Sequence, residues 1–189
     1  MPENGGQALS EGAAHVAFPR FWLVFDVEAI GLYGEGFAVG YCVTDALGQE
    51  VVAGRNSCEP SRAVGHIHDY LWVRKNIPDL TPTQETPREM RRAFAYTLTK
   101  WIADGAAVVV DCGYPVETNF LRAIVRDDPA WRTPYPLFEL ASLLMVAGRD
   151  PIATYPRLPH ELPAHDPLCD ARQSSRLWHE TLRGLRNQQ

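Results

Sequence analysis

The stretch FWLVFDVEAIGL, residues 21–32, decides how the rest of this sequence is interpreted. Its apolar run from Phe21 to Phe25 has the length and composition of a strand that is buried on both faces. Asp26 and Glu28 follow, and side chains two positions apart on a strand point to the same face. Two carboxylates held a few Å apart repel each other by about 1 kcal/mol in water and by more in a drier site. The stretch therefore indicates either a cation site at the end of a buried strand or an exposed strand end with acidic turn residues.

The composition is that of a globular protein with one core. The chain has 189 residues, of which 46% are hydrophobic and 22% are charged, and this length suits one domain better than two. The net charge of −5 argues against a chain that coats nucleic acid indiscriminately, and it fits a site that gathers carboxylates around metal ions. Residues 1–17 lack the pattern of a signal peptide, so we expect a flexible leader there and a single domain over residues 18–189.

Hydropathy and cysteine usage predict a cytoplasmic protein. No apolar run approaches the ~18 residues that a membrane span needs, so we expect no membrane association. The four cysteines show no CxxC spacing, and Cys42 and Cys112 lie in or beside apolar strands, which favours reduced, buried thiols. A zinc site formed by Cys58, His66 and His68 is an alternative, but no second ligand pair has the usual zinc spacing.

The order of the expected elements predicts an α/β fold. Alternating apolar residues over 37–44 and a turn over 45–48 add two antiparallel strands to the first, the second of them over Glu50–Ser57. A capping box of Thr86 and Glu89 begins a clear helix, and strands and helices alternate from there on, as in parallel crossover units. We therefore expect a mixed five-stranded sheet, three antiparallel strands followed by parallel strands, flanked by helices. The other expected elements are a possible helix within Ala63–Lys75, a strand over Ala106–Val110, a helix starting near Pro115, a strand over Tyr135–Leu140, a short helix over Ala141–Ala147, a loop over Gly148–Pro163 and a final helix capped by Asp166.

Polar residues gather at the ends of these elements. In open α/β sheets, sites form outside the carboxyl ends of parallel strands, so residues far apart in the sequence can converge there. Three or four carboxylates and one histidine are the equipment of two-metal phosphoryl chemistry. Each residue also has a plainer explanation, as a turn residue, a partner of a helix dipole or an exposed loop histidine. The candidates are Asp26, Glu28, Asp111, Glu117, His165 and Asp170.

Two of these groups resemble motifs of the DEDDh 3′–5′ exonucleases, the DnaQ-like or ribonuclease T-like family. Residues 25–32, FDVEAIGL, are similar to the first motif, Asp-x-Glu with Gly-Leu shortly after. Residues 165–171, HDPLCDA, are similar to the third motif, in which a His is followed five residues later by Asp and then Ala. The resemblance covers residues 21–185 and implies a ribonuclease H-like fold.

The second motif departs from the family pattern. The family has an Asp that opens a helix three residues before an apolar pair such as Phe-Leu. Here Phe120-Leu121 is preceded at that distance by Glu117, and the nearest Asp lies six residues further back, at Asp111. Glu117 matches in position and Asp111 matches in residue type, and both could contact metal.

The resemblance implies hydrolysis of single-stranded DNA or RNA from its 3′ end to nucleoside monophosphates. It implies two Mg²⁺ or Mn²⁺ ions. Asp26 would bridge them, the other acids would complete their coordination, and His165 would take a proton from the attacking water. His165 is expected on a loop outside the final helix, and Asp170 is expected in the first turn of that helix.

The residues that would hold the substrate are less specific. Ile30, Leu32 and Tyr33 follow the first motif and could stack on terminal bases, although residues after a strand are more often core. Arg172 and Arg176 lie one turn apart on the final helix and could contact phosphates, or they could lie on a solvated helix face.

Two other functions remain compatible with the sequence. One is a nucleic-acid-binding or protein-interaction module on the same fold, whose altered second motif has cost it catalysis. The other is a different ribonuclease H-like enzyme, such as an endonuclease. A homodimer is also possible, since many small members of the family are dimers.

Overall fold

The computed structural model describes residues 18–187, so the expected leader, residues 1–17, lies outside the described residues. A five-stranded sheet in the order β3-β2-β1-β4-β5 forms the centre of the molecule. β1 pairs antiparallel with β2, and β2 with β3, whereas β1 and β4, and β4 and β5, pair parallel. The predicted mixed α/β sheet is therefore confirmed. The strands are β1 (Phe21–Ala29), β2 (Gly36–Asp45), β3 (Glu50–Ser57), β4 (Ala106–Val110) and β5 (Leu137–Glu139).

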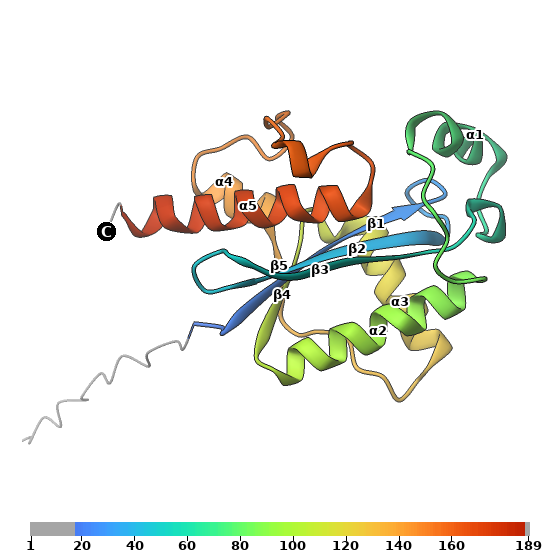
Figure 1. Cartoon of the computed structure of the whole chain (residues 1–189), viewed down its shortest axis with the longest axis horizontal. Coiled ribbons are helices and arrows are strands. Elements are labelled where there is room, and N and C mark those ends of the chain that lie inside the picture. Colours follow the sequence, from blue (N-terminus) through green and yellow to red (C-terminus); the bar gives the residue numbers. More distant parts are fainter. Residues whose placement is uncertain (1–17, 188–189) are drawn as a thin grey trace, which may run out of the picture.

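Helices cover both faces of the sheet. In Figure 1, α4 and α5 lie over one face, α2 and α3 lie over the other, and α1 lies at one end of the sheet. None of the described helices is both long and apolar enough to cross a membrane. The helices are α1 (Ile67–Asn76), α2 (Pro87–Ala103), α3 (Thr118–Asp127), α4 (Leu140–Val146) and α5 (Pro167–Arg186), together with the short helical turns η1 (Pro60–Arg62), η2 (Gly113–Glu117) and η3 (Pro159–Glu161).

β1 is buried on both faces because its side chains alternate between two cores. Leu23 and Phe25 belong to the core under α2 and α3, whereas Trp22 and Val24 belong to the core under α4 and α5. All four side chains are buried, and each burial of this size stabilises the fold by roughly 1.5–3 kcal/mol. The predicted central strand is confirmed.

α2 shows how local sequence and packing agree. The Thr86 hydroxyl accepts a hydrogen bond from the backbone N of Glu89, and the Glu89 carboxylate accepts one from the backbone N of Thr86, both at 3.2 Å. Met90, Phe94 and Leu98 recur at helical spacing and are fully buried against the sheet. The predicted capping box and helix are both confirmed.

The boundaries of some elements differ from the prediction. β5 covers only Leu137–Glu139, shorter than the strand predicted over 135–140, because Pro136 has no N–H to donate to the ladder. After β4 the chain first makes the wide turn η2 and only then enters α3. Glu117 therefore precedes α3, whereas the sequence placed it in the first turn of that helix. The loop over 148–163 also contains the short turn η3.

The cysteines are free thiols, with one correction to the prediction. Cys42 is buried as expected, but Cys112 is exposed because it lies in the turn after β4 and not in the strand. The buried thiol of Cys58 donates to the carbonyl O of Phe37 at 3.5 Å, while the exposed rings of His66 and His68 stack on each other. Within residues 18–187, Cys58 and these two histidines do not form a group of metal ligands, so the zinc alternative has no support. 

Candidate active site

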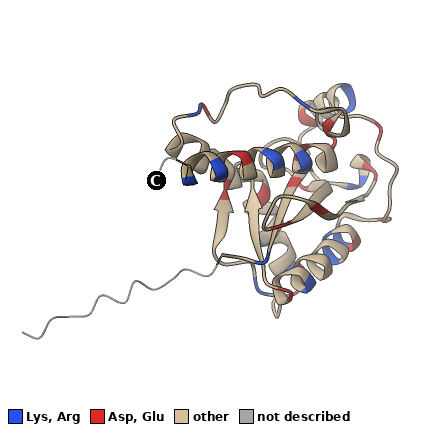
Figure 2. Ribbon diagram, turned by 60° about the vertical axis from the view of Figure 1, so that its left-hand side comes forward, with Lys and Arg blue, Asp and Glu red and all other residues tan. Residues whose placement is uncertain are grey.

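β1 delivers two carboxylates to one side of the sheet. Trp22 and Val24 face α5, so the residues that continue this alternation, Asp26 and Glu28, face α5 as well. The pairing of β1 with β4 ends at Phe25, so both carboxylates lie past the carboxyl end of β4. Figure 2 shows acidic residues at these strand ends, whereas many basic residues lie along α2 and α5.

The start of α5 carries a histidine and an aspartate to the same place. Asp166 caps the helix, and its carboxylate accepts a hydrogen bond from the backbone N of Leu168 at 3.0 Å. His165 lies just outside the helix, in a left-handed backbone conformation with φ +63° that is uncommon for residues other than glycine. Asp170 lies in the first turn. The positions predicted for all three residues are confirmed.

Gly40 allows the first turn of α5 to approach the sheet. It is the β2 residue that pairs with Asp26. A Cβ atom at this position would lie only 2.1 Å from the backbone N of Leu168 and the backbone C of Pro167. A side chain on Gly40 would therefore push α5 off the sheet and separate Asp170 from Asp26.

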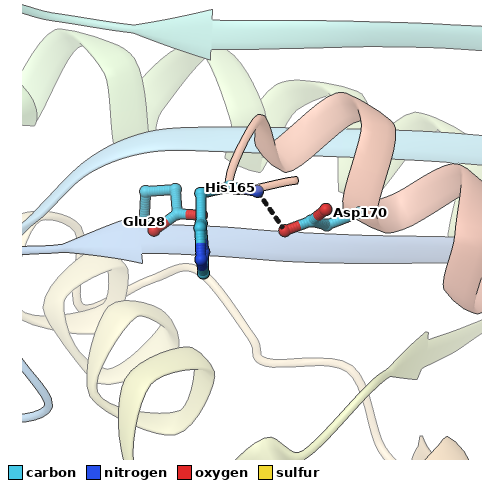
Figure 3. Close-up of side chains that lie close together, drawn as sticks. All are labelled: Glu28, His165 and Asp170. Carbon is cyan, nitrogen blue, oxygen red and sulfur yellow. Dashed lines mark hydrogen bonds and ion pairs between the residues drawn. The ribbon is translucent and has the colours of Figure 1, made fainter. Parts of the chain in front are cut away.

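Glu28, His165 and Asp170 form a tight group, although they come from a strand, a loop and a helix (Figure 3). One potential ligand atom from each residue lies within 4.8 Å of those from the other two. Nδ1 of His165 lies 3.9 Å from Oε1 of Glu28, and the backbone N of His165 donates to Oδ2 of Asp170 at 3.1 Å. The first and third motifs therefore meet in space.

The carboxyl group of Asp26 is surrounded by other acids. Burial raises the pKa of Asp26 well above its ordinary value, and the negative charges of Glu28, Asp170, Glu117 and Asp111 raise it further, in that order of effect. The structure thus brings together all five acids that the sequence singled out. We call these five residues the acid cluster.

The acid cluster is electrostatically unbalanced. Burial, and then the charge of Asp170, raise the pKa of Glu28 to about 8. Burial also raises the pKa of Glu117 to about 7, with a further contribution from the charge of Asp111. Carboxylates in such a place hold protons more firmly than in water unless a cation replaces the protons. The cluster therefore favours binding of positive charge.

The two candidates for the second motif occupy different environments. Glu117 is only 6% exposed, and the nearby backbone of Val27 on β1 lowers its pKa, against the larger effect of burial. Asp111 follows β4 directly, and its side chain is exposed. The charges of both act on Asp26, and that of Glu117 acts more strongly.

Three residues outside the predicted set also lie at the site. Nη1 of Arg157 lies 2.6 Å from Oδ1 of Asp170, and the ring of Trp72 on α1 meets the ring of His165 edge-on, with centroids 5.5 Å apart. Glu139, at the end of β5, accepts a hydrogen bond from the backbone N of Gly113 at 2.8 Å, and its charge helps to raise the pKa of Glu117 after burial and Asp111. Glu139 could have been predicted from the sequence as a site residue, since it too ends a parallel strand. No periodicity or motif marks Arg157 or Trp72.

The residues predicted to bind substrate after β1 differ in exposure. Leu32 and Tyr33 are exposed after β1, and the hydroxyl of Tyr33 interacts with that of Tyr114. Ile30 is only 1% exposed and packs in a core with Phe37 under α1, so the structure does not bring it to the surface.

The two arginines of α5 are engaged in ion pairs. Arg172 donates to both carboxylate oxygens of Glu50 at 2.9 Å. Arg176 pairs with Glu161 at 2.6 Å and with Glu180 at 3.1 Å. Among the described residues, the partners of both arginines lie outside the acid cluster, so a contact with phosphate would compete with these pairs.

The side chains present fit a hard divalent cation. Oxygen ligands dominate the acid cluster, and Mg²⁺ and Mn²⁺ prefer oxygen ligands. Glu28, His165 and Asp170 already place potential ligand atoms within one coordination sphere of each other. The raised pKa values of Glu28 and Glu117 are what uncompensated carboxylates show when they are gathered to hold an ion.

No protein-family model and no curated protein matches this sequence. Among solved structures, Escherichia coli exonuclease I in a zinc-bound complex with single-stranded DNA has a TM-score of 0.57 at 14% identity, covering 86% of this chain and 40% of that one. Exonuclease I from Methylocaldum szegediense gives 0.55 at 16% identity, covering 86% and 40%. Escherichia coli exonuclease I with a dA16 oligonucleotide gives 0.54 at 15% identity, covering 83% and 39%. The chain thus spans about two fifths of the length of these proteins, and it has the ribonuclease H-like fold that they also contain.

Proposed function

We propose that this protein is a metal-dependent 3′–5′ exonuclease of the DEDDh type, which hydrolyses single-stranded DNA or RNA to nucleoside monophosphates. The observation that carries the proposal is the group of Glu28, His165 and Asp170, which lies beside Asp26 at the carboxyl end of the parallel strands. This group joins hard oxygen ligands to an imidazole that can accept a proton, and metal-dependent phosphodiester hydrolysis uses both.

The acid cluster would hold two Mg²⁺ or Mn²⁺ ions, with Asp26 among the ligands. Bound divalent ions lower the pKa of a coordinated water and neutralise charge on the phosphate. Asp26, Glu28 and Asp170 are the ligands from the first and third motifs. We assign Glu117 as the second-motif ligand, because it is buried beside β1 and acts on Asp26 more strongly than Asp111 does.

His165 is suited to accept a proton from the attacking water. Its side chain is 47% exposed, so a water molecule and the substrate can reach the ring. Its backbone N is anchored to Asp170, which fixes the base of the side chain while the ring remains accessible. Glu28 beside Nδ1 stabilises the imidazolium that forms when the ring takes the proton.

Exposed apolar side chains beside the site suit a single-stranded substrate. Leu32, Tyr33, Trp72 and Tyr114 are all exposed, and unpaired bases stack on such side chains with about 1–3 kcal/mol per base. Several of the similar exonuclease I structures are complexes with single-stranded oligonucleotides, which supports this choice of substrate. The homodimer and the cytoplasmic location remain predictions.

A second candidate function is a binding module on the same fold. Two observations favour it: the second motif offers Glu117 where the family has Asp, and Arg157 pairs with Asp170. Both changes could weaken metal binding without preventing nucleic-acid binding.

The test is a degradation assay on 5′-labelled single-stranded DNA and RNA oligomers. With Mn²⁺ or Mg²⁺ we expect a ladder of products shortened one nucleotide at a time from the 3′ end, and none with EDTA. Blocking the 3′ end should prevent shortening. Binding without shortening would support the binding module, and internal cuts would support an endonuclease.

A further inference from the structure

Arg157 contacts the acid cluster, although it belongs to none of the three motifs. Its Nη1 lies 2.6 Å from Oδ1 of Asp170 and also donates to the backbone O of Glu161 at 2.9 Å. The other carboxylate oxygen, Oδ2, accepts the backbone N–H of His165. Both oxygens of Asp170 are therefore engaged by protein groups.

Hydrogen bonds and ion pairs hold the segment around Arg157 in place. Glu161, which accepts from Arg157 through its backbone, is fully buried, and its carboxylate pairs with Arg176 on α5. Its carboxylate also accepts the backbone N–H of Leu158 at 2.9 Å, and Arg176 donates to the backbone O of Pro156 at 2.8 Å. The segment on both sides of Arg157 is thus fixed to α5, and the guanidinium is held in place.

Arg157 has a distinct electrostatic position. Among residues 18–187, its pair with Asp170 is the one salt bridge between an arginine or lysine and a member of the acid cluster. The positive charge also acts on Asp111, where it opposes the rise in pKa caused by the crowding of protein atoms around the carboxylate and by the charges of Asp170 and Glu139. Arg157 therefore pairs with one carboxylate of the acid cluster and acts on a second.

We propose that Arg157 is a fixed counter-ion of the acid cluster, which stabilises the cluster without metal and competes with divalent cations for Asp170. A positive charge within ion-pair distance of a metal ligand lowers the affinity of that ligand for a further cation, and this repulsion reaches about tenfold in affinity even under strong screening. The backbone N–H of His165 already orients Asp170, so Arg157 is not needed for that purpose.

The role follows from charge, so three variants separate charge from geometry. Arg157→Gln removes the charge, and Arg157→Lys keeps it while losing the planar fork of the guanidinium. Arg149→Gln is the matched control, because Arg149 belongs to the same connection but bonds the hydroxyl of Thr181 and lies over the ring of Tyr155.

The first measurement is Mn²⁺ binding to the full chain by calorimetry, without substrate. We expect Arg157→Gln to bind Mn²⁺ about tenfold more tightly than wild type. Arg157→Lys and Arg149→Gln should bind as wild type does. If Arg157→Gln binds Mn²⁺ equally or more weakly, Arg157 is not a competing counter-ion and the inference is overturned.

The second measurement is thermal unfolding, which does not depend on activity. In EDTA, Arg157→Gln should unfold at a lower temperature than wild type, because the acid cluster has lost its counter-ion, and Mn²⁺ should close this gap. A gap that Mn²⁺ leaves unchanged, as expected for Arg149→Gln, would show a merely structural role and overturn the inference.

Because this role rests on the proposed metal-dependent function, the outcomes must separate the two. Tight Mn²⁺ binding by wild type together with unchanged binding by Arg157→Gln refutes only the counter-ion. Binding by Arg157→Gln but not by wild type supports the counter-ion and refutes the metal-loaded enzyme. If neither binds Mn²⁺, both are refuted.

Discussion

Two charged regions of this molecule differ in how far their charges are compensated by neighbouring groups. On α2, the side chain of Arg91 is buried, and its Nη1 lies 2.6 Å from Glu35 and its Nε 2.6 Å from Asp127. At the carboxyl end of the parallel strands, four carboxylates surround that of Asp26, and one arginine, Arg157, pairs with one of them, Asp170. The guanidinium of Arg91 thus has two carboxylate partners, whereas the acid cluster leaves negative charge uncompensated.

The difference shows which group serves the fold and which serves chemistry. A buried arginine with two carboxylates within hydrogen-bond distance needs nothing further, and removing one partner would leave an unpaired charge. Like charges held together destabilise the folded protein, so they persist where another requirement keeps them. Mutations in the two regions should therefore have opposite effects on stability and activity.

The largest expected effect is the loss of hydrolysis in Asp26→Asn. Because Asp26 is the buried carboxylate around which the other four acids lie and would be a metal ligand, its loss should reduce hydrolysis about 10³-fold or more. The metal-free variant should be at least as stable as wild type, because one of the crowded charges is gone. Oligomer shortening and urea unfolding in EDTA measure the two effects.

Arg91→Leu is the control variant from the other charged region, where Arg91 pairs with Glu35 and Asp127. It should lower the free energy of unfolding by about 2 kcal/mol, since it leaves two partly exposed carboxylates unpaired. Activity per folded molecule should be unchanged. Full activity of Asp26→Asn with metal present would refute the assignment of the site.

The next largest effect is expected for His165→Ala. Loss of a general base typically reduces the rate by 10²–10⁴-fold, and we expect kcat to fall within this range. His160→Ala, an exposed histidine on the same connection before α5, should leave kcat unchanged. Equal rates for His165→Ala and wild type would mean that another group takes the proton.

Amide variants of Glu117 and Asp111 test which of the two is the second-motif ligand. Glu117→Gln should reduce kcat by about 10²-fold, because it removes a buried ligand, whereas Asp111→Asn should cost about tenfold or less, as a group that acts on the ligands does. Steady-state kinetics with Mn²⁺ decides between them. If the larger loss follows Asp111→Asn, the assignment is reversed.

The acid cluster should also make stability depend on pH. The pKa of Glu28 rises from its ordinary 4.5 to about 8 in the folded protein, so the folded state holds this proton more firmly than the unfolded chain. The corresponding stability is present below about pH 4.5 and is lost as the pH rises to about 8.

Thermal unfolding between pH 5 and pH 9 tests this dependence. In EDTA the melting temperature should fall with rising pH, and Glu28→Gln should flatten the curve. Mn²⁺ should oppose the fall, because the ion binds better as protons leave the carboxylates. A flat wild-type curve in EDTA would contradict the raised pKa.

The smallest effect is expected at Trp72. An edge-on aromatic contact is worth about 0.5–1.5 kcal/mol, so Trp72→Leu should lower kcat by roughly 2–10-fold through a less well positioned His165. Trp72→Phe should keep most of the rate. The pH profile of kcat should shift in Trp72→Leu, and an unchanged profile would show that the contact does not position His165.

The sequence by itself determined the features that depend on local geometry. Alternation along β1 buries Trp22 and Phe25 on opposite faces and sends Asp26 and Glu28 to one side, because successive side chains of a strand point in opposite directions. The cap formed by Asp166 likewise determines that His165 lies outside α5 and that Asp170 lies within it.

Only the tertiary structure decided which distant groups meet. The close approach at Gly40 places α5 over β1, the fixed segment before α5 brings Arg157 to Asp170, and Ile30 turns into the core while Tyr33 stays outside. The reason is physical: these contacts join segments far apart in the chain, and their free energy depends on how whole helices pack on the sheet and not on the residues next to them in sequence.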